Sequence, residues 1–250
     1  MQQFIRIIIL LFIGQLMVYA ADLELKVEQQ AIKLPYWAAE KPHYGGVLIV
    51  NGGASAQWSE SLTHLAQLLA NNGWSTVLLN CTPEIKISWI KQVPEAISAL
   101  RKEKNKRIVL IHYGEELNTT LDYFSKPQGK GINGLVLLSA KDDKAIAAET
   151  EKFRFPIFDI AGQFDYEAVL NQFAERKKGF ESTTYLSLKL PGADHQYNYA
   201  QELLISFLTG WMLKIPEPTV AAPPINPKSL VHSFIPPINS FASQLVAINW

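Results

Sequence analysis

The chain has 250 residues, 48% of them hydrophobic, and its 23 basic and 23 acidic side chains give a formal net charge of zero. This length and apolar content suit one α/β domain with a sizeable core, and no second globular domain is required. The balanced charge argues against nucleic acid as a partner. The single cysteine, Cys81, excludes an internal disulfide and a cysteine-based zinc site.

The first twenty residues have the pattern of a secretory signal peptide. Arg6 supplies one positive charge, an apolar run covers residues 7–13, and small residues precede an expected cut before Ala21. The alternative, an uncleaved membrane anchor, needs about 20 apolar residues, and this run is interrupted at Gly14. We therefore expect residues 1–20 to be removed and the mature chain to be exported, to the periplasm or the medium, with no transmembrane segment.

Short apolar runs then alternate with longer segments of helical period, which predicts a mostly parallel sheet with helices on both faces. Residues 23–28 alternate strictly between apolar and polar side chains, as expected of an antiparallel edge strand with one exposed face. The following elements are predicted, in chain order, as a strand at 46–51, a helix at 59–71, a strand at 75–80, a helix at 89–102, a strand at 107–112, a helix at 115–124, a strand at 134–140, a helix at 142–151, a strand at 156–161, a helix at 166–178, a strand at 183–190 and a helix at 197–213.

Composition changes after Lys214. Seven of the 14 prolines lie beyond it, and proline removes a backbone donor that central strands and helices need. We therefore predict an α/β domain over residues 21–214 and an extended proline-rich arm over residues 215–250.

The candidate site residues follow the predicted strands. In an open parallel sheet, functional groups gather beyond the carboxyl ends of the strands. Asp165 follows the strand at 156–161 and His195 follows the strand at 183–190, so both are expected at the same edge. Alone, Asp165 could cap a helix and His195 could be a loop histidine. Together, their order predicts a carboxylate that orients a proton-carrying imidazole.

A glycine loop at the end of the strand at 46–51 is a second candidate. Asn51, Gly52 and Gly53 can turn tightly and present N–H groups, with Ser55 close behind. Such a loop can form half of an oxyanion hole, and a plain glycine turn is an equally good interpretation.

On these pieces the chain resembles the α/β-hydrolase superfamily over residues 45–213. More narrowly, it is similar to an uncharacterised family of exported bacterial proteins, a domain of unknown function. The resemblance implies a single-domain α/β-hydrolase-like fold in which Asp165 is the triad acid and His195 the triad base.

The resemblance fails at the nucleophile elbow, a sharp turn whose serine has small residues two positions to either side. Here Tyr113 takes the place of the serine, and Ile111 and Glu115 take the places of the small residues. With a pKa of about 10, the tyrosine phenol is only about 0.1% ionised at neutral pH, so we expect Tyr113 to fill or close the site. Ser139, at the end of the strand at 134–140, and Ser55 are the alternative nucleophiles.

Two hypotheses for function follow. In the first, the protein lacks serine-hydrolase activity and binds a small molecule or an envelope component outside the cytoplasm. In the second, it is an ester or acyl hydrolase that has moved its nucleophile and kept Asp165 and His195. Neither needs a cofactor or a metal, since the histidines show no metal spacing and no phosphate-binding glycine motif occurs. The sequence leaves open whether the protein is an enzyme.

Overall fold

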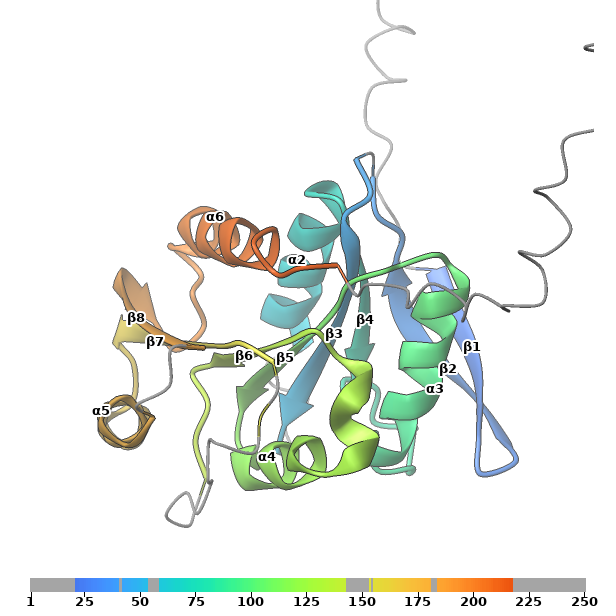
Figure 1. Ribbon diagram of the computed structural model, residues 1–250, viewed down its shortest axis with the longest axis horizontal. Coiled ribbons are helices and arrows are strands. Elements are labelled where there is room, and N and C mark those ends of the chain that lie inside the picture. Colours follow the sequence, from blue (N-terminus) through green and yellow to red (C-terminus); the bar gives the residue numbers. More distant parts are fainter. Residues whose placement is uncertain are drawn as a thin grey trace, which may run out of the picture. The chain divides into compact units, whose positions relative to one another are not determined.

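An eight-stranded sheet forms the centre of the computed structural model (Figure 1), which describes residues 21–40, 42–53, 59–142, 153, 155–180 and 184–217. The strands are β1 (Ala21–Val27), β2 (Gln30–Trp37), β3 (Gly45–Gly52), β4 (Trp74–Leu79), β5 (Ile108–Gly114), β6 (Gly134–Leu138), β7 (Ile157–Phe164) and β8 (Tyr185–Asp194). The helices are α2 (Ser59–Asn71), α3 (Trp89–Lys102), α4 (Leu117–Ser125), the short 3₁₀ helix η2 (Pro127–Gly131), α5 (Glu167–Gly179) and α6 (Gln201–Met212).

Some predicted segments lie outside the described residues. These are the signal peptide at 1–20, Ser55, nearly all of the helix at 142–151 and the proline-rich arm from residue 218 on.

The strands run in the order β1-β2-β4-β3-β5-β6-β7-β8 across the sheet. From β4 to β8 all neighbours are parallel, whereas β1 pairs antiparallel with β2, and β2 pairs antiparallel with β4. The predicted mostly parallel sheet with an antiparallel N-terminal edge strand is therefore confirmed. In β1 the alternating pattern buries Leu25 and Val27 and exposes their neighbours, as predicted.

The sequence analysis missed β2. Its hairpin turn consists of Glu28 and Gln29, both with positive φ, rather than the glycine or asparagine that usually signals such a turn. Pro35 also argues against a strand. The proline is tolerated because of its place in the pairing with β1, which starts at the pair Val27 and Gln30. Hydrogen-bonded and non-hydrogen-bonded pairs alternate along an antiparallel ladder, and Pro35 falls in a non-hydrogen-bonded pair, where its missing N–H is not needed for bonding to β1.

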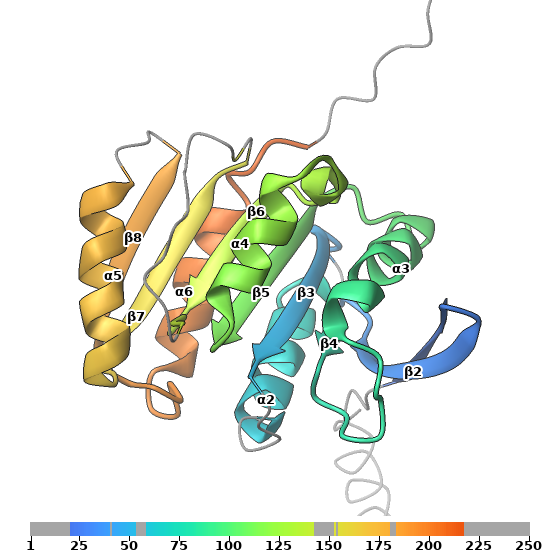
Figure 2. The same ribbon diagram turned by 90° about the horizontal axis from the view of Figure 1, so that it is seen from below.

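Helices cover both faces of the sheet, as predicted. Figures 1 and 2 show α2 and α6 on one face, and α3, α4 and α5 on the other. Successive residues of a strand point to opposite faces. In β5, Ile111 packs in the core under α2 and α6, while Leu110 packs in the core under α3 and α4. Every residue of β3, β4, β5 and β6 is buried, as strands covered on both sides must be.

The predicted helices at 59–71 and 89–102 begin and end at the predicted residues. Other boundaries shift: α4 begins two residues and α6 four residues later than predicted, and β7 and β8 end three and four residues later than predicted. The loops before α4 and α6, beyond β5 and β8, carry the candidate site.

Candidate functional site

The candidate residues lie at the carboxyl ends of five neighbouring parallel strands. Asn51 and Gly52 close β3, Tyr113 lies near the end of β5, and Ser139 follows β6. Asp165 follows β7 and His195 follows β8. The parallel register brings these strand ends to one edge of the sheet, where the sequence analysis placed them.

Asp165 and His195 are in direct contact. The ring Nδ1 of His195 lies 2.6 Å from Oδ1 of Asp165, and both residues are buried. Gly162 makes this contact possible, because a Cβ there would lie 2.6 Å from the backbone oxygen of Asp194. The absence of that Cβ lets the end of β7 approach β8, and the register shifts between Gly162 and Phe164.

Backbone and side-chain donors surround the Asp165 carboxylate. The backbone N–H of Tyr166 donates to Oδ1 at 2.8 Å, and that of Gly162 donates to Oδ2 at 3.2 Å. The Ser139 hydroxyl also donates to Oδ2. Burial alone would raise the pKa of Asp165, but the hydrogen bonds from His195 and Ser139 outweigh it, so the pKa lies below its ordinary value. Asp165 is therefore ionised at neutral pH.

An ionised Asp165 fixes the tautomer of the His195 ring. The carboxylate only accepts hydrogen bonds, so Nδ1 carries the proton, and in the neutral ring Nε2 is the basic nitrogen. Two aromatic rings flank the imidazole, that of Tyr166 at a centroid distance of 4.4 Å and that of Tyr113 at 5.3 Å. The pair is thus an oriented base, able to accept a proton at Nε2.

Ser139 contacts the carboxylate of Asp165. Besides its bond to Asp165, its hydroxyl lies 2.7 Å from the Tyr197 hydroxyl, which in turn donates to the backbone oxygen of Ile160 at 3.3 Å. Ser139 and Tyr197 both have positive φ, of 48° and 59°. Two non-glycine residues in the left-handed region thus place their hydroxyls beside Asp165, a sign that the surrounding fold fixes this network.

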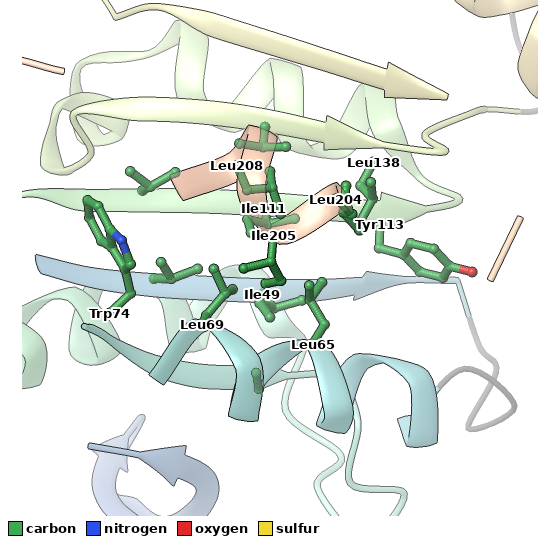
Figure 3. Close-up of a cluster of buried hydrophobic side chains, with 14 of the residues drawn as sticks. Ile49, Leu65, Leu69, Trp74, Ile111, Tyr113, Leu138, Leu204, Ile205 and Leu208 are labelled. Carbon is green, nitrogen blue, oxygen red and sulfur yellow. The ribbon is translucent and has the colours of Figure 1, made fainter. Parts of the chain in front are cut away.

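Tyr113 is held by its hydroxyl as well as by its ring. The side chain is buried, and its hydroxyl donates to the backbone oxygen of His195 at 3.2 Å. In Figure 3 the ring lies at the end of the apolar cluster beside Leu138, with its oxygen pointing away from the aliphatic side chains. Burial, with the charge of Asp165, raises the pKa of Tyr113 far above its ordinary value, so the phenol stays protonated.

His112 lies on the other face of β5 and organises the turn that follows. Its Nε2 lies 2.7 Å from the backbone oxygen of Glu115, and its Nδ1 lies 2.7 Å from Oγ1 of Thr120 in α4. Burial lowers the pKa of His112 to about 4, partly opposed by the bond to Glu115. The ring is therefore neutral at pH 7 and joins the strand, the turn and the helix.

The predicted glycine loop packs against this turn. A Cβ at Gly52 would lie 1.8 Å from the backbone oxygen of Glu115, so only glycine fits there. The side chain of Asn80 donates to the backbone oxygens of Asn51 and Gly53, at 2.7 and 2.9 Å. The loop is thus fixed up to Gly53, and Ser55 lies outside the described residues.

A small pocket lies beside Tyr113, and its walls include Ser61, Leu65, Tyr197 and Gln201. Exposed aromatic side chains lie at the same edge, namely Phe164 at the end of β7 and Tyr166 and Tyr199 beyond β7 and β8. Within the described ranges, no group of three His, Cys, Asp or Glu side chains could hold a metal ion. Over the same part of the chain, none of the helices has the length and apolar character needed to cross a bilayer.

The structure joins four of the residues singled out from the sequence, Asp165, His195, Ser139 and Tyr113, into one contact group. The sequence analysis did not find Tyr166 and Tyr197, which it placed at helix starts. Nor did it single out Gly114, although a glycine at the end of an apolar strand is a turn signal.

Comparison with known proteins gives the fold. No protein-family model matches the sequence, and no curated protein sequence matches it. Solved structures do match. A dienelactone hydrolase from Anabaena variabilis matches with a TM-score of 0.63 and 13% identity, over 78% of this chain and 96% of that one.

Two further structures give the same result. An α/β serine hydrolase without a lid from Xanthomonas campestris has a TM-score of 0.59 and 12% identity, with 82% of this chain and 97% of that one covered. A Pyrococcus furiosus esterase has a TM-score of 0.60 and 17% identity, with 78% and 90% covered. At these identities the likeness concerns the fold alone. The chain therefore has the single-domain fold of the α/β serine hydrolases.

Proposed function

We propose that this protein is an exported α/β-hydrolase-fold protein that binds a ligand at the Asp165–His195 site and lacks serine-hydrolase chemistry. In this proposal it is related to the exported bacterial family that its sequence resembles, in which the nucleophile elbow is degenerate. Its ligand is a small molecule or an envelope component.

One observation among the described residues carries the proposal: the hydroxyls of Tyr113 and Ser139, which lie beside the oriented base, are hydrogen-bonded to other partners. The Tyr113 hydroxyl donates to the backbone oxygen of His195, in a side chain whose raised pKa keeps the phenol protonated. The Ser139 hydroxyl is bonded to Asp165 and Tyr197, on the carboxylate side of the imidazole. A nucleophile needs a base within hydrogen-bonding reach, and neither hydroxyl has that arrangement with the His195 ring.

The expected size of the effect supports this choice. Removing the serine of a serine-protease triad lowers turnover about 10⁶-fold, on the order of 8 kcal/mol of barrier. A site that keeps the acid and the base but not the nucleophile therefore retains a polar, oriented pocket with little hydrolytic use. The centroid of the Tyr166 ring lies 4.4 Å from that of the His195 ring, and the residue is 52% exposed, so it gives a ligand an aromatic surface beside the imidazole.

The test is to treat the purified mature protein with a fluorophosphonate probe and to assay short-chain esters. We expect no labelling and no ester turnover above the rate without protein, with a cooperative unfolding transition showing that the protein is folded. Labelling that disappears in His195→Ala would overturn the proposal.

The contact between Asp165 and His195 favours one alternative, an ester or acyl hydrolase with a relocated nucleophile. The two candidate nucleophiles are Ser139 and Ser55. If the wild type is labelled, Ser55→Ala identifies the attacking residue, since labelling should be lost if Ser55 attacks and retained if Ser139 attacks. The absence of labelling and turnover in the folded protein would exclude this alternative.

A further inference from the structure

The chain changes direction after β5 at a glycine. Gly114 ends the strand with a φ of +81°, and Glu116, at +60°, precedes α4. In the nucleophile elbow, the attacking residue sits on such a sharp strand-to-helix turn and is exposed above the sheet. Tyr113 lies one residue earlier, inside β5, in register with Asn51 of β3 and Leu138 of β6. The position at the turn itself is Gly114.

There is room for a side chain at this position. Among the residues that the structure describes, a Cβ added to Gly114 would meet only the backbone oxygen of Gly52, at an ordinary distance of 3.7 Å. At Gly52, by contrast, an added Cβ would collide with Glu115. Packing against the described residues therefore imposes glycine at 52 but not at 114, where the positive φ favours it.

The turn is also tied to the strand ends that carry the oriented base. The backbone N–H of Lys141, two residues beyond Ser139, donates to the backbone oxygen of Gly114 at 2.7 Å. On its other side, Gly114 follows Tyr113, which contacts His195 through both its hydroxyl and its ring.

We propose that Gly114 occupies the place of the nucleophile, so that the attacking group is missing because the turn residue has no side chain. This inference rests on the proposed function and adds the position at which the missing nucleophile would lie. Tyr113 then acts as a wall of the site, through its bond to the His195 backbone.

The residue after the turn completes the inference. In this fold the backbone N–H after the nucleophile and an N–H of the β3 loop form the oxyanion hole, which would here involve Glu115 and the loop at Gly53. The Glu115 carboxylate lies over that loop, since a Cβ added at Gly53 would be 2.8 Å from its Oε2. Lys141 pairs with Glu115 at 2.9 Å. A carboxylate disfavours a second negative charge nearby, so two adjacent residues, Gly114 and Glu115, disable the hydrolytic site.

The experiment restores the hydroxyl at two alternative positions. Gly114→Ser and Tyr113→Ser are treated with a fluorophosphonate, with Gly114→Ala as the folding control. In a reactive variant the serine oxygen attacks phosphorus, fluoride leaves, and the hydroxyl proton passes to His195. We expect Gly114→Ser to be labelled at least about 100-fold faster than the wild type, a fraction of the range that a triad serine controls.

The controls decide between the positions. The labelling of Gly114→Ser should disappear when His195→Ala is added. The labelling rate should rise about tenfold when Glu115→Gln is added, because removing one like charge lowers the free energy of the negatively charged transition state by the equivalent of about one pKa unit, which is a factor of ten in rate. Labelling of Tyr113→Ser but not of folded Gly114→Ser would overturn the assignment. An unchanged rate on adding Glu115→Gln would overturn the role given to Glu115.

Two outcomes separate this inference from the proposed function. Labelling of the wild type would end the proposed function, while the comparison of the two serine variants would still locate the turn position. If Gly114→Ser does not fold, Gly114→Asp is used, because aspartate accepts positive φ more readily. Its carboxylate should then shift the ¹⁵N resonances of the His195 ring, and unchanged resonances in a folded variant would contradict the inference.

Discussion

Four donors converge on the carboxylate of Asp165. Two are backbone N–H groups of its own turn, from Gly162 and Tyr166, and two are side chains that arrive from β6 and from the loop after β8, Ser139 and His195. Such a carboxylate is held in one orientation and stays ionised, so it fixes the imidazole rather than taking its proton. Ser139 is therefore a positioning residue in this structure.

Replacing Ser139 by alanine tests that role. The variant removes a buried donor to Asp165 and leaves the Tyr197 hydroxyl with one partner fewer, so the free energy of unfolding should fall by about 1–3 kcal/mol. Ser125→Ala is the matched control, because the exposed Ser125 hydroxyl bonds only to the backbone of its own helix at Asp122. Urea denaturation measures both. Unchanged stability of Ser139→Ala would contradict the positioning role.

The buried His112 gives the protein a specific pH dependence. Its pKa is lowered to about 4 in the folded state, against about 6.5 in the unfolded chain, so the unfolded chain binds the extra proton between these values. The stability contributed by the neutral ring is complete above pH 6.5 and falls by about 3 kcal/mol on going down to pH 4.

Urea denaturation between pH 4 and pH 7 measures this effect. The wild type should lose stability more steeply than His112→Gln, in which no group titrates at this position. Equal slopes for the two proteins would contradict the lowered pKa of His112.

Helix α5 contacts the edge of the sheet through an ion pair as well as through apolar packing. Its apolar cluster is small, with Ala161, Val169 and Phe173 buried. The guanidinium of Arg176 forms two hydrogen bonds with the carboxylate of Asp159, at 2.6 and 3.0 Å, and both side chains are fully shielded from water. The Tyr185 hydroxyl donates to the same carboxylate from β8.

Breaking this pair should therefore be costly. Arg176→Met leaves the Asp159 carboxylate buried without its countercharge, and we expect a loss of about 3–5 kcal/mol in unfolding free energy. The double variant Arg176→Met with Asp159→Asn should recover part of the loss, because no charge is then left unpaired. Thermal and urea unfolding measure the three proteins. A double variant no more stable than Arg176→Met would contradict this account.

At the scale of the whole molecule, the order of the strands assembles the site. β3 and β5 lie side by side in the middle of the sheet, with β6, β7 and β8 following in sequence order (Figure 1). The glycine loop, the turn after β5 and the Asp165–His195 pair therefore meet at one edge, although 144 residues separate Asn51 from His195. This arrangement follows the rule that sites in such sheets form at the carboxyl ends of the strands.

The predicted export of the protein is tested on the full chain. We expect expression in a bacterial host to give an exported protein whose intact mass corresponds to a chain starting at Ala21, because the apolar run of residues 7–13 suits a cleaved signal peptide. Leu10→Asp is the control, since a charge within that run should leave the precursor uncleaved. Recovery of the full-length chain in the membrane fraction would indicate an anchor instead.

The sequence by itself determined the class of fold, six strands of the parallel sheet and the edge that carries Asp165 and His195. Each of these depends on local signals: apolar runs for buried strands, helical periodicity between them, and a polar residue just after a strand. β2 was not predicted because its turn lacks glycine and the strand contains Pro35. Both are accepted only because the neighbouring strands supply the register.

Only the tertiary structure decided which side chains of the site are hydrogen-bonded to one another. The Ser139 hydroxyl finds its partners 26 and 58 residues away, at Asp165 and Tyr197, and no local pattern encodes such distances. The direction of the Tyr113 hydroxyl and the positive φ of Gly114 depend on how β5 packs between β3 and β6. Local sequence sets which elements form, whereas contacts between distant segments set where a side chain points.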